Sequence, residues 1–357
     1  MRKMKLSIDK NIQEIPFYPR AMKYGLDDAW ARLASNENPF PPSQKALSVM
    51  LEAMASVNRY PGNAFELKTA IADKYKVKPD QVVLGDGSDE LIELALKAMK
   101  HQVKNNVIIS EPSFAFYAIA SKIYGYETRR VPVTNMKVSL DHIKEAIDDK
   151  TRVIFLNNPL NPTGTIFEDD VFRNFLRILP PDVLVVVDEA YAEFSESSAF
   201  PDAFQYINDY PVLILRTFSK AYALAGLRVG YGIGETSLVS FLERTQQPFS
   251  VNTIALAGAK AAIEDVAYLE KVLANNREGK QFIYNAFKKL SIEYVLTEAN
   301  FILFKYEKNA EALIKRLFEE KILARWMNPY GLPDYIRISI GTMEENKRFI
   351  EALEKTL

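Results

Sequence analysis

Short, uninterrupted runs of apolar residues recur through the middle of the chain and alternate with helical patterns. A strand buried on both faces of a parallel sheet reads as such a run, and helical crossovers join parallel neighbours. The pattern predicts an α/β fold around a mainly parallel, seven-stranded sheet. Strands are expected at 81–84, 106–109, 127–131, 152–156, 183–187, 212–216 and 229–233, with helices at 89–100, 114–124, 140–146 and 169–179.

The end of the chain reads differently and predicts a small α+β domain. Helices are expected at 237–245, 254–287, 310–319 and 344–355, and strands at 293–296, 301–305 and 335–340. Pro248 and the polar stretch Ser250–Asn252 mark a boundary. We therefore expect an N-terminal arm at 1–35, a large cofactor-binding domain at 36–250 and a small C-terminal domain at 251–357.

Composition narrows the classes of function. The formal net charge of −1 provides no electrostatic case for nucleic acid or an anionic membrane. The apolar runs are far too short to span a bilayer. The chain has no cysteine, which excludes disulfides, thiolate metal sites and a cysteine nucleophile and fits a reducing cytosol. The basic start, MRKMKLSIDK, lacks the apolar stretch of a signal peptide, so we expect a soluble cytoplasmic protein.

We do not expect histidine to be the proton carrier in this chain. The two histidines, His101 and His142, lie far in sequence from any candidate nucleophile, and we interpret both as surface residues. Without a histidine cluster or thiolates, no metal site is expected.

Two glycine-containing turns follow predicted strands. Gly85–Glu90, GDGSDE, opens a helix whose free N–H groups suit an anion, although an ordinary helix cap explains the same residues. Asn157–Gly164, NNPLNPTG, makes a rigid turn at the carboxyl end of a strand, where ligands of parallel sheets collect. A simple turn explains this segment equally well, so neither identifies a site alone.

A carboxylate and a lysine follow two further strands. Asp188 lies just beyond an apolar strand, so it needs a partner, which can be a metal, a protonated ring nitrogen or the next helix. Lys220 follows a strand that ends at Arg216, in an apolar segment rich in Ala and Gly. This setting weakens the alternative of a solvated surface cation. Lysine forms Schiff bases when burial or a nearby cation leaves its amine partly neutral.

All four segments lie at strand ends of one predicted sheet. Together they offer a carboxylate, an amine and anion-binding N–H groups. A flat, anionic cofactor that bears an aldehyde would use every one of these groups.

The order of the motifs resembles that of fold-type I pyridoxal phosphate aminotransferases, the class I/II group with the aspartate aminotransferase-like fold. The match covers nearly the whole chain and includes SNENP (35–39), RYPG (59–62), GDGSDE, EPSFAFY (111–117), NPTG (161–164), DEAYAEF (188–194), RTFSKAYALAGLRVG (216–230) and YGLPDYIRISIGT (330–342). Within that group, SNENP, DEAYAEF and RISIGT resemble the histidinol-phosphate aminotransferases. The resemblance implies pyridoxal 5'-phosphate as cofactor and a homodimer with shared active sites.

The resemblance also implies roles for individual residues. Lys220 would hold the cofactor as a Schiff base and, once displaced, act as the catalytic base. Asp188 and Tyr191 would complete the catalytic set, with Asp188 paired to the protonated pyridine nitrogen. The remaining cofactor contacts would be Asn161 and Tyr191 at the phenolic oxygen, Phe114 on the ring face, and Ser88, Asp89, Thr217, Ser219, Arg228 and the partner subunit's Tyr60 at the phosphate. The substrate would be bound by Arg337, Arg325, Asn36 and Tyr18.

The implied activity moves an amino group between histidinol phosphate and 2-oxoglutarate, a step of histidine biosynthesis between small molecules. Two departures leave an aromatic amino acid aminotransferase as an alternative. Phe17 stands where the family usually has a tyrosine that touches the substrate phosphate, with Tyr18 next to it, and Trp326 follows Arg325. A phosphothreonine decarboxylase of the same fold is a second alternative. A non-catalytic cofactor-binding protein is disfavoured by the intact set of Lys220, Asp188, Asn161 and Arg337.

Overall fold

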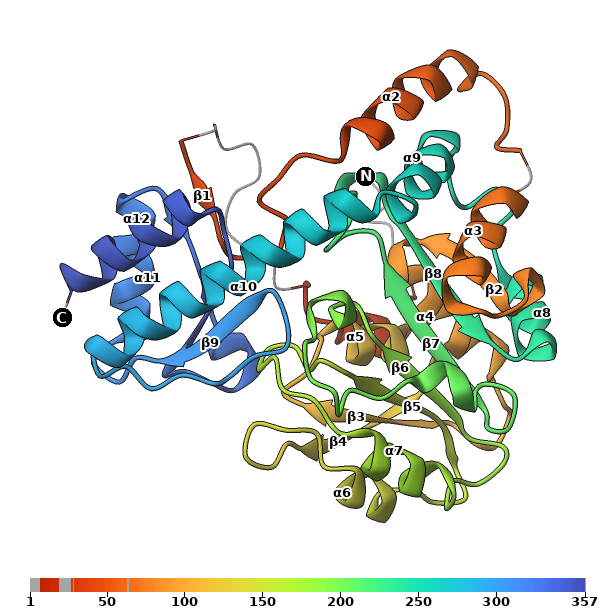
Figure 1. Ribbon diagram of the computed structural model, residues 1–357. Coiled ribbons are helices and arrows are strands. Elements are labelled where there is room, and N and C mark those ends of the chain that lie inside the picture. Colours follow the sequence, from red (N-terminus) through yellow and green to blue (C-terminus); the bar gives the residue numbers. More distant parts are fainter. Residues whose placement is uncertain (1–6, 19–26, 28, 63, 357) are drawn as a thin grey trace, which may run out of the picture.

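The computed structural model describes residues 7–18, 27, 29–62 and 64–356 of the chain. A large unit surrounds a seven-stranded sheet and a smaller unit surrounds a three-stranded sheet. The long helix α10 (Val266–Lys289) runs from one unit to the other (Figure 1). The predicted α/β fold with a smaller C-terminal unit is therefore confirmed.

All seven predicted strands are present in the large sheet. Its order is β2-β8-β7-β6-β5-β3-β4, with bounds β2 Val82–Asp86, β3 Asn106–Glu111, β4 Glu127–Pro132, β5 Thr151–Asn157, β6 Leu184–Asp188, β7 Val212–Thr217 and β8 Val229–Gly234. Strands β4, β3, β5, β6 and β7 run parallel, whereas β8 is antiparallel to both β7 and β2. Because β8 returns beside β7, the loop between them stays at the carboxyl edge of the parallel strands.

Helices cover both faces of this sheet, so its inner strands are apolar on both sides, whereas the edge strand β4 is largely polar. In β6, Leu184 and Val186 belong to one core cluster, and Val185 and Val187 to the other. The first cluster includes side chains of α4 (Gly87–Ala98), α5 (Phe116–Ile123) and α8 (Thr236–Thr245). The second includes side chains of α3 (Phe65–Tyr75), α6 (Leu140–Glu145), α7 (Asp169–Leu176) and α9 (Thr253–Ile263).

The small unit has its own core. Strands β11 (Arg325–Trp326) and β9 (Phe301–Lys305) pair antiparallel with β12 (Tyr335–Ser339), and α10, α11 (Ala310–Glu319) and α12 (Met343–Glu354) contribute to the same cluster. An N-terminal strand also joins this unit, since β1 (Ala31–Arg32) pairs parallel with β10 (Ile322–Leu323). The segment that follows β1 therefore leaves the small unit and enters the junction between the two.

Two predicted elements are wrong. The single helix expected at 254–287 is broken into α9 and α10, because the side chain of Asp265 accepts a hydrogen bond from the backbone N–H of Tyr268 and caps a new helix. The strand expected at 293–296 is only an isolated bridge between Tyr294 and Phe304. The remaining short elements are α1 Lys10–Gln13, α2 Gln44–Ala53 and the 3₁₀ turns Met54–Ser56, Pro79–Gln81, Ala192–Phe194, Ala203–Tyr206, Ala225–Leu227 and Asn328–Tyr330.

The domain limits remain a proposal. Ala255 and Ala259 of α9 belong to the core of the large unit, whereas Ile283 and Phe287 of α10 belong to the core of the small one. We therefore propose that the junction lies within α10 and not at the predicted residue 250.

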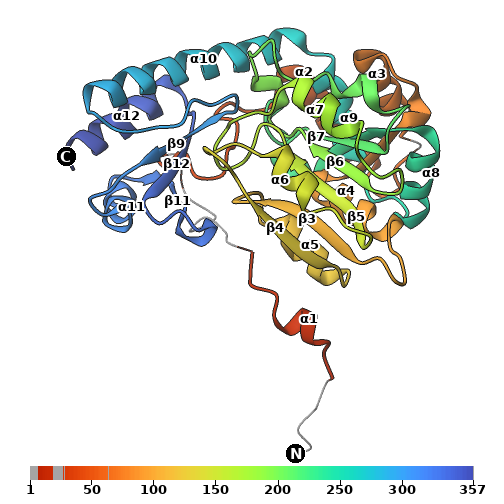
Figure 2. The same cartoon turned by 90° about the horizontal axis from the view of Figure 1, so that it is seen from below.

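Among the described residues no helix is both long and apolar enough to cross a membrane. His101 and His142 are exposed, as predicted. Figure 2 shows α1 projecting away from the body of the molecule, with Glu14 beside it paired to Lys122 of α5 at 3.1 Å. The start of the chain (1–6) and residues 19–26, which follow Tyr18, lie outside the described residues.

Candidate active site

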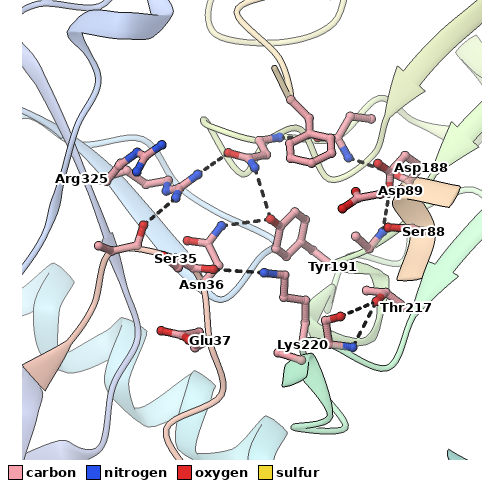
Figure 3. Close-up of a pocket in the computed structure, with 18 of the residues that line it drawn as sticks. Ser35, Asn36, Glu37, Ser88, Asp89, Asp188, Tyr191, Thr217, Lys220 and Arg325 are labelled. Carbon is pink, nitrogen blue, oxygen red and sulfur yellow. Dashed lines mark hydrogen bonds between the residues drawn. The ribbon is translucent and has the colours of Figure 1, made fainter. Parts of the chain in front are cut away.

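A cavity of about 720 Å³ lies at the carboxyl edge of the large sheet, where the two units meet. Every predicted site residue except Tyr60 lines it: Tyr18, Asn36, Ser88, Asp89, Phe114, Asn161, Asp188, Tyr191, Thr217, Ser219, Lys220, Arg228, Arg325 and Arg337. Figure 3 shows labelled members of this set, among them Asp188, Lys220 and Arg325, facing one space from strand ends, turns and the small unit. Residues up to 319 positions apart in sequence thus face one space.

Asp188 lies at the buried floor of the cavity. One carboxylate oxygen, Oδ1, accepts a hydrogen bond from the backbone N–H of Ala190 at 3.1 Å. The other, Oδ2, accepts from the hydroxyl of Tyr117 at 2.5 Å. Burial raises the pKa of Asp188 to about 6, although both hydrogen bonds act to lower it. The carboxylate is therefore oriented and still able to accept a further donor from the cavity.

A chain of side-chain hydrogen bonds crosses the cavity between the two units. The hydroxyl of Tyr191 accepts from the amides of Asn36 at 3.0 Å and Asn161 at 3.2 Å. The Asn161 carbonyl oxygen in turn accepts from the guanidinium of Arg337 in the small unit. Arg337 also donates to the backbone oxygen of Ala34 at 2.9 Å. Its buried Nε has no hydrogen-bond partner in the described structure, which leaves donor capacity for an anionic ligand.

Lys220 reaches the middle of the cavity. Its Nζ donates to the backbone oxygen of Ser35 at 3.0 Å and lies 5.8 Å from the centre of the Tyr191 ring. Burial lowers the pKa of Lys220 to about 8, the Arg337 cation acts in the same direction, and Glu37 opposes it. At pH 7 about one amine in ten is then neutral, far more than for an exposed lysine. This is the state in which an amine attacks a carbonyl.

The opposite end of the cavity is built to hold an anion. Ser88 and Asp89 lie in the first turn of α4, whose backbone N–H groups are free to bind an anion at this end. Thr217 and Ser219 present hydroxyls 2.9 Å apart. Arg228 lies on the same side and pairs with Asp89 at 3.2 Å.

Glycines make room for this turn. A Cβ on Gly230 would lie 2.7 Å from the backbone nitrogen of Ser88, and one on Gly87 would lie 2.4 Å from the Arg228 guanidinium. Gly87 also has a φ of +72°, which favours glycine. The close approach that only glycine allows, together with the free amine and the oriented carboxylate, fits a phosphorylated aldehyde with a ring nitrogen.

Aromatic side chains line the wall and the mouth of the cavity. Phe114 lies edge-on to Tyr117, with ring centroids 5.5 Å apart, and Tyr18 lies edge-on to Phe114 at 6.2 Å. At the mouth the Arg325 guanidinium lies 5.9 Å from the centre of the Tyr330 ring. Burial raises the pKa of Tyr18, so its hydroxyl stays a donor at neutral pH.

Tyr60 lies outside the cavity. It is 80% exposed and stacks on Phe249, with ring centroids 4.6 Å apart. Within one chain it contributes nothing to the site, so its predicted role depends on a partner subunit.

The sequence reasoning missed Tyr117, Ser35 and Tyr330. Tyr117 belongs to the EPSFAFY motif, one helical turn beyond Phe114, and this spacing was the available signal. Ser35 acts through its backbone oxygen. Because every residue has such an oxygen, the residue type gives no signal for this contact. Among the described residues no cluster of three or more His, Cys, Asp or Glu side chains is arranged to hold a metal ion.

Comparison with known proteins agrees with this geometry. The family model for "Aminotransferase class I and II" matches residues 29–353. The chain is 43% identical to histidinol-phosphate aminotransferase 2 of Pseudomonas fluorescens, over 91% of this chain and 88% of the relative. It is 38% identical to histidinol-phosphate aminotransferase of Desulfotalea psychrophila, over 99% of this chain and 96% of the relative.

The fold has solved counterparts as well. The crystal structure of histidinol-phosphate aminotransferase from Sinorhizobium meliloti, in complex with pyridoxal-5'-phosphate, matches with a TM-score of 0.88. The two chains are 25% identical, and the match covers 99% of this chain and 100% of that one. Thermus thermophilus aspartate aminotransferase with maleate has the same fold, with a TM-score of 0.85 over 99% of this chain and 100% of that one at 18% identity. The chain belongs to the aminotransferase class I and II family.

Proposed function

We propose that this chain exchanges an amino group between histidinol phosphate and 2-oxoglutarate, with pyridoxal 5'-phosphate held at Lys220. The observation that carries the proposal is the convergence of Lys220, Asp188 and Arg337 on one cavity. The relatives named histidinol-phosphate aminotransferase support the choice of substrate. The activity places the enzyme in histidine biosynthesis.

The proposed cofactor contacts follow from the positions of the side chains. Asp188 would accept from the ring nitrogen, Asn161 and Tyr191 would contact the phenolic oxygen, and Phe114 would cover the ring. The phosphate would lie between the start of α4, the hydroxyls of Thr217 and Ser219, and Arg228. When bound, the cofactor ring draws electrons from the substrate α-carbon and so makes its proton removable.

Lys220 would perform the proton transfer. Burial lowers the pKa of its amine to about 8, so at neutral pH a fraction of the amine is neutral and able to act as a base. In the proposal it takes the proton from the α-carbon of the amino substrate. No histidine is needed for this step, in keeping with the exposed positions of His101 and His142.

Two arginines face the part of the cavity left for the substrate. Glutamate and 2-oxoglutarate carry carboxylates, whereas histidinol phosphate carries a phosphate, so the site must accept both anions. Arg337 is held by Asn161 and Ala34 and keeps an unused donor, which suits it to grip either anion. Arg325, at the mouth with Tyr330, would complete the phosphate contact.

The arm residue that faces the cavity is Tyr18. Phe17 is fully exposed and does not line the cavity, whereas Tyr18 does. The tyrosine hydroxyl needed for a phosphate contact is therefore present one position later than the family usually has it. Trp326 does not line the cavity either, and its Nε1 donates to the backbone oxygen of Pro333 at 2.7 Å. Both observations favour histidinol phosphate over an aromatic amino acid.

A substrate panel tests the proposal. We expect kcat/KM for histidinol phosphate to exceed that for phenylalanine, with 2-oxoglutarate as acceptor and ping-pong kinetics. A clear preference for phenylalanine would instead identify an aromatic amino acid aminotransferase. Failure of glutamate to convert the bound cofactor to its amino form, seen by absorbance, would favour a decarboxylase.

A variant pair tests the phosphate contact. Tyr18→Phe removes the hydroxyl and should raise KM for histidinol phosphate about tenfold, the value of a hydrogen bond to a charged group. KM for glutamate should change little. Phe17→Leu, at the exposed neighbour, serves as control and should leave both values unchanged. Equal effects of Tyr18→Phe on both substrates would contradict a phosphate role.

We also propose a homodimer with shared sites, in the cytoplasm. Exposed apolar side chains support the dimer: Leu51, Met54 and Val57 lie on α2 and just after it, Tyr60 stacks on Phe249, and each of the five is more than half exposed. Exposed apolar side chains of this size are typical of interaction surfaces. Tyr60 would then reach the phosphate of the partner's site. The absence of cysteine from the sequence supports a reducing compartment.

A further inference from the structure

The hydroxyl of Tyr117 is aimed at the floor of the active site. Tyr117 lies on α5 and its side chain is completely buried. Its ring stacks on Phe155 of β5, with centroids 5.0 Å apart and planes 5° apart, and it lies edge-on to Phe114 at 5.5 Å. These contacts leave the ring little freedom. The hydroxyl consequently points at Oδ2 of Asp188, 2.5 Å away.

The Asp188 carboxylate is held by two donors from different elements. The backbone N–H of Ala190 binds Oδ1 and the Tyr117 hydroxyl binds Oδ2. Each oxygen can accept a second hydrogen bond, and Asp188 lines the cavity. We propose that Tyr117 is a positioning residue that keeps the Asp188 carboxylate ionised and aimed at the ring nitrogen of the bound cofactor. The inference rests on the proposed function, because it requires that nitrogen to bind at Asp188.

The charges around Asp188 support this role. Four titratable groups face it: Tyr117 from α5, Asp89 from α4, Lys220 from the loop after β7, and Tyr191 from the turn after β6. Burial raises the pKa of Asp188, and the Tyr117 hydrogen bond is the largest influence that lowers it. The pKa of Tyr117 is itself raised well above 10 by burial, so the hydroxyl remains a donor throughout the neutral range.

Loss of the Tyr117 hydroxyl should therefore shift the pKa of Asp188 in a predictable direction. Without it the pKa of Asp188 rises, and the carboxyl is neutral at a pH where the wild-type group is charged. A neutral carboxyl no longer balances a protonated ring nitrogen. The pH below which the cofactor is lost should thus move upward. A tyrosine that only fills space would not produce this shift.

Binding of pyridoxamine 5'-phosphate to the cofactor-free enzyme tests the inference. This probe has no aldehyde, so it reports on the site without a covalent bond to Lys220. We would measure its Kd from pH 5 to pH 9 for wild type, Tyr117→Phe and Tyr126→Phe. The difference between each variant and wild type cancels the titration of the probe itself.

Tyr126→Phe is the matched control. Tyr126 is also buried in the same core cluster, and its hydroxyl donates to the backbone oxygen of Leu96 at 2.9 Å, away from the cavity. We expect Tyr117→Phe to raise the midpoint pH of binding by about one unit, so that binding weakens about tenfold at pH 5 and about twofold at pH 7. Tyr126→Phe should keep the wild-type midpoint. An unchanged midpoint in Tyr117→Phe would overturn the inference.

A second substitution covers the case in which Tyr117→Phe does not fold. Incorporation of 3,5-difluorotyrosine at position 117 keeps the ring and makes the hydroxyl a stronger donor. The midpoint pH should then fall, and a rise or no change would overturn the inference. Wild-type enzyme that does not bind the probe at any pH would contradict the proposed cofactor site as well, whereas a normal wild type beside an unresponsive Tyr117 variant contradicts only the role of Tyr117.

Discussion

The side-chain amine of Lys220 donates a hydrogen bond to the backbone carbonyl oxygen of Ser35, 3.0 Å away. Ser35 follows β1, which pairs with β10 of the small unit, whereas Lys220 belongs to the large unit. The reactive amine is therefore held by a segment tied to the other unit. The mobility of the Lys220 amine therefore depends on the position of the small unit relative to the large one.

Replacement of Lys220 should separate catalysis from cofactor binding. In Lys220→Ala we expect kcat to fall by about 10² to 10⁴, the usual contribution of a positioned base. Cofactor affinity should fall less, because Asp188 and the phosphate contacts remain. Steady-state kinetics and equilibrium dialysis measure the two effects. Lys280→Met, at a buried lysine paired with Glu196 outside the cavity, is the control. Near-normal transamination by Lys220→Ala would overturn the mechanism.

Arg337 should lower the pKa of the Lys220 amine. Burial and, after it, the Arg337 cation lower the pKa of Lys220 to about 8. Arg337→Met removes that cation, so the pKa of Lys220 rises and the neutral amine appears only at higher pH. The rate at which cofactor-free enzyme captures pyridoxal 5'-phosphate, followed from pH 6 to pH 10, should show a midpoint displaced upward. Arg325→Met should displace it less, and a lower midpoint in Arg337→Met would contradict the prediction.

Behind the site, Arg216 joins the ends of β6 and β7 through a buried ion pair. It contacts Glu189 at 2.6 Å and Glu193 at 3.1 Å. Arg216→Met would leave two buried carboxylates without their cation. We expect a loss of about 3–5 kcal/mol in the free energy of unfolding at pH 8, measured with urea.

The same variant should recover stability in acid. Burial raises the pKa of Glu189 to about 7 even though Arg216 lowers it, so the pKa rises further when Arg216 is removed. The folded variant then binds a proton that the unfolded chain releases above about pH 4.3, and stability is lost as the pH rises through the folded pKa. The loss should accordingly be smaller at pH 5.5 than at pH 8. Arg129→Met, at the partly exposed pair with Asp148, should lose less than about 1 kcal/mol at both pH values. A larger loss in acid for Arg216→Met would refute the assignment.

Mixed dimers test whether the sites are shared. Lys220→Ala retains Tyr60, and Tyr60→Ala retains Lys220. In a mixed dimer one site has the lysine of one subunit and the tyrosine of the other, whereas the second site has neither. Refolding the two variants together should thus produce more activity than either alone, with one intact site in each mixed dimer. Activity no greater than the sum of the separate variants would exclude a contribution of Tyr60 across the interface.

Much of the fold was predictable from local pattern. Six of the seven strands of the large sheet follow from apolar runs, since a strand buried on both faces must be apolar, whereas the edge strand β4 is largely polar. Motifs at strand ends also indicated residues that the structure brings together: Asp188 ends β6, Asn161 and Lys220 follow β5 and β7, and all three line one cavity. The errors occur where the local signal is weak. A helical pattern continues through Asp265, although its side chain caps a new helix there, and the alternation at 293–296 forms only a bridge.

The sequence by itself determined the elements of the sheet and the residue types that gather at its carboxyl edge, because burial and helix periodicity are local properties of a chain. Only the tertiary structure decided which side chains touch. It aimed Tyr117 at Asp188, 71 positions away, and brought the Ser35 backbone to Lys220, 185 positions away. It also turned Tyr18, and not Phe17, toward the cavity. Contacts of this kind depend on packing between distant segments, and such packing leaves no periodic trace in the sequence.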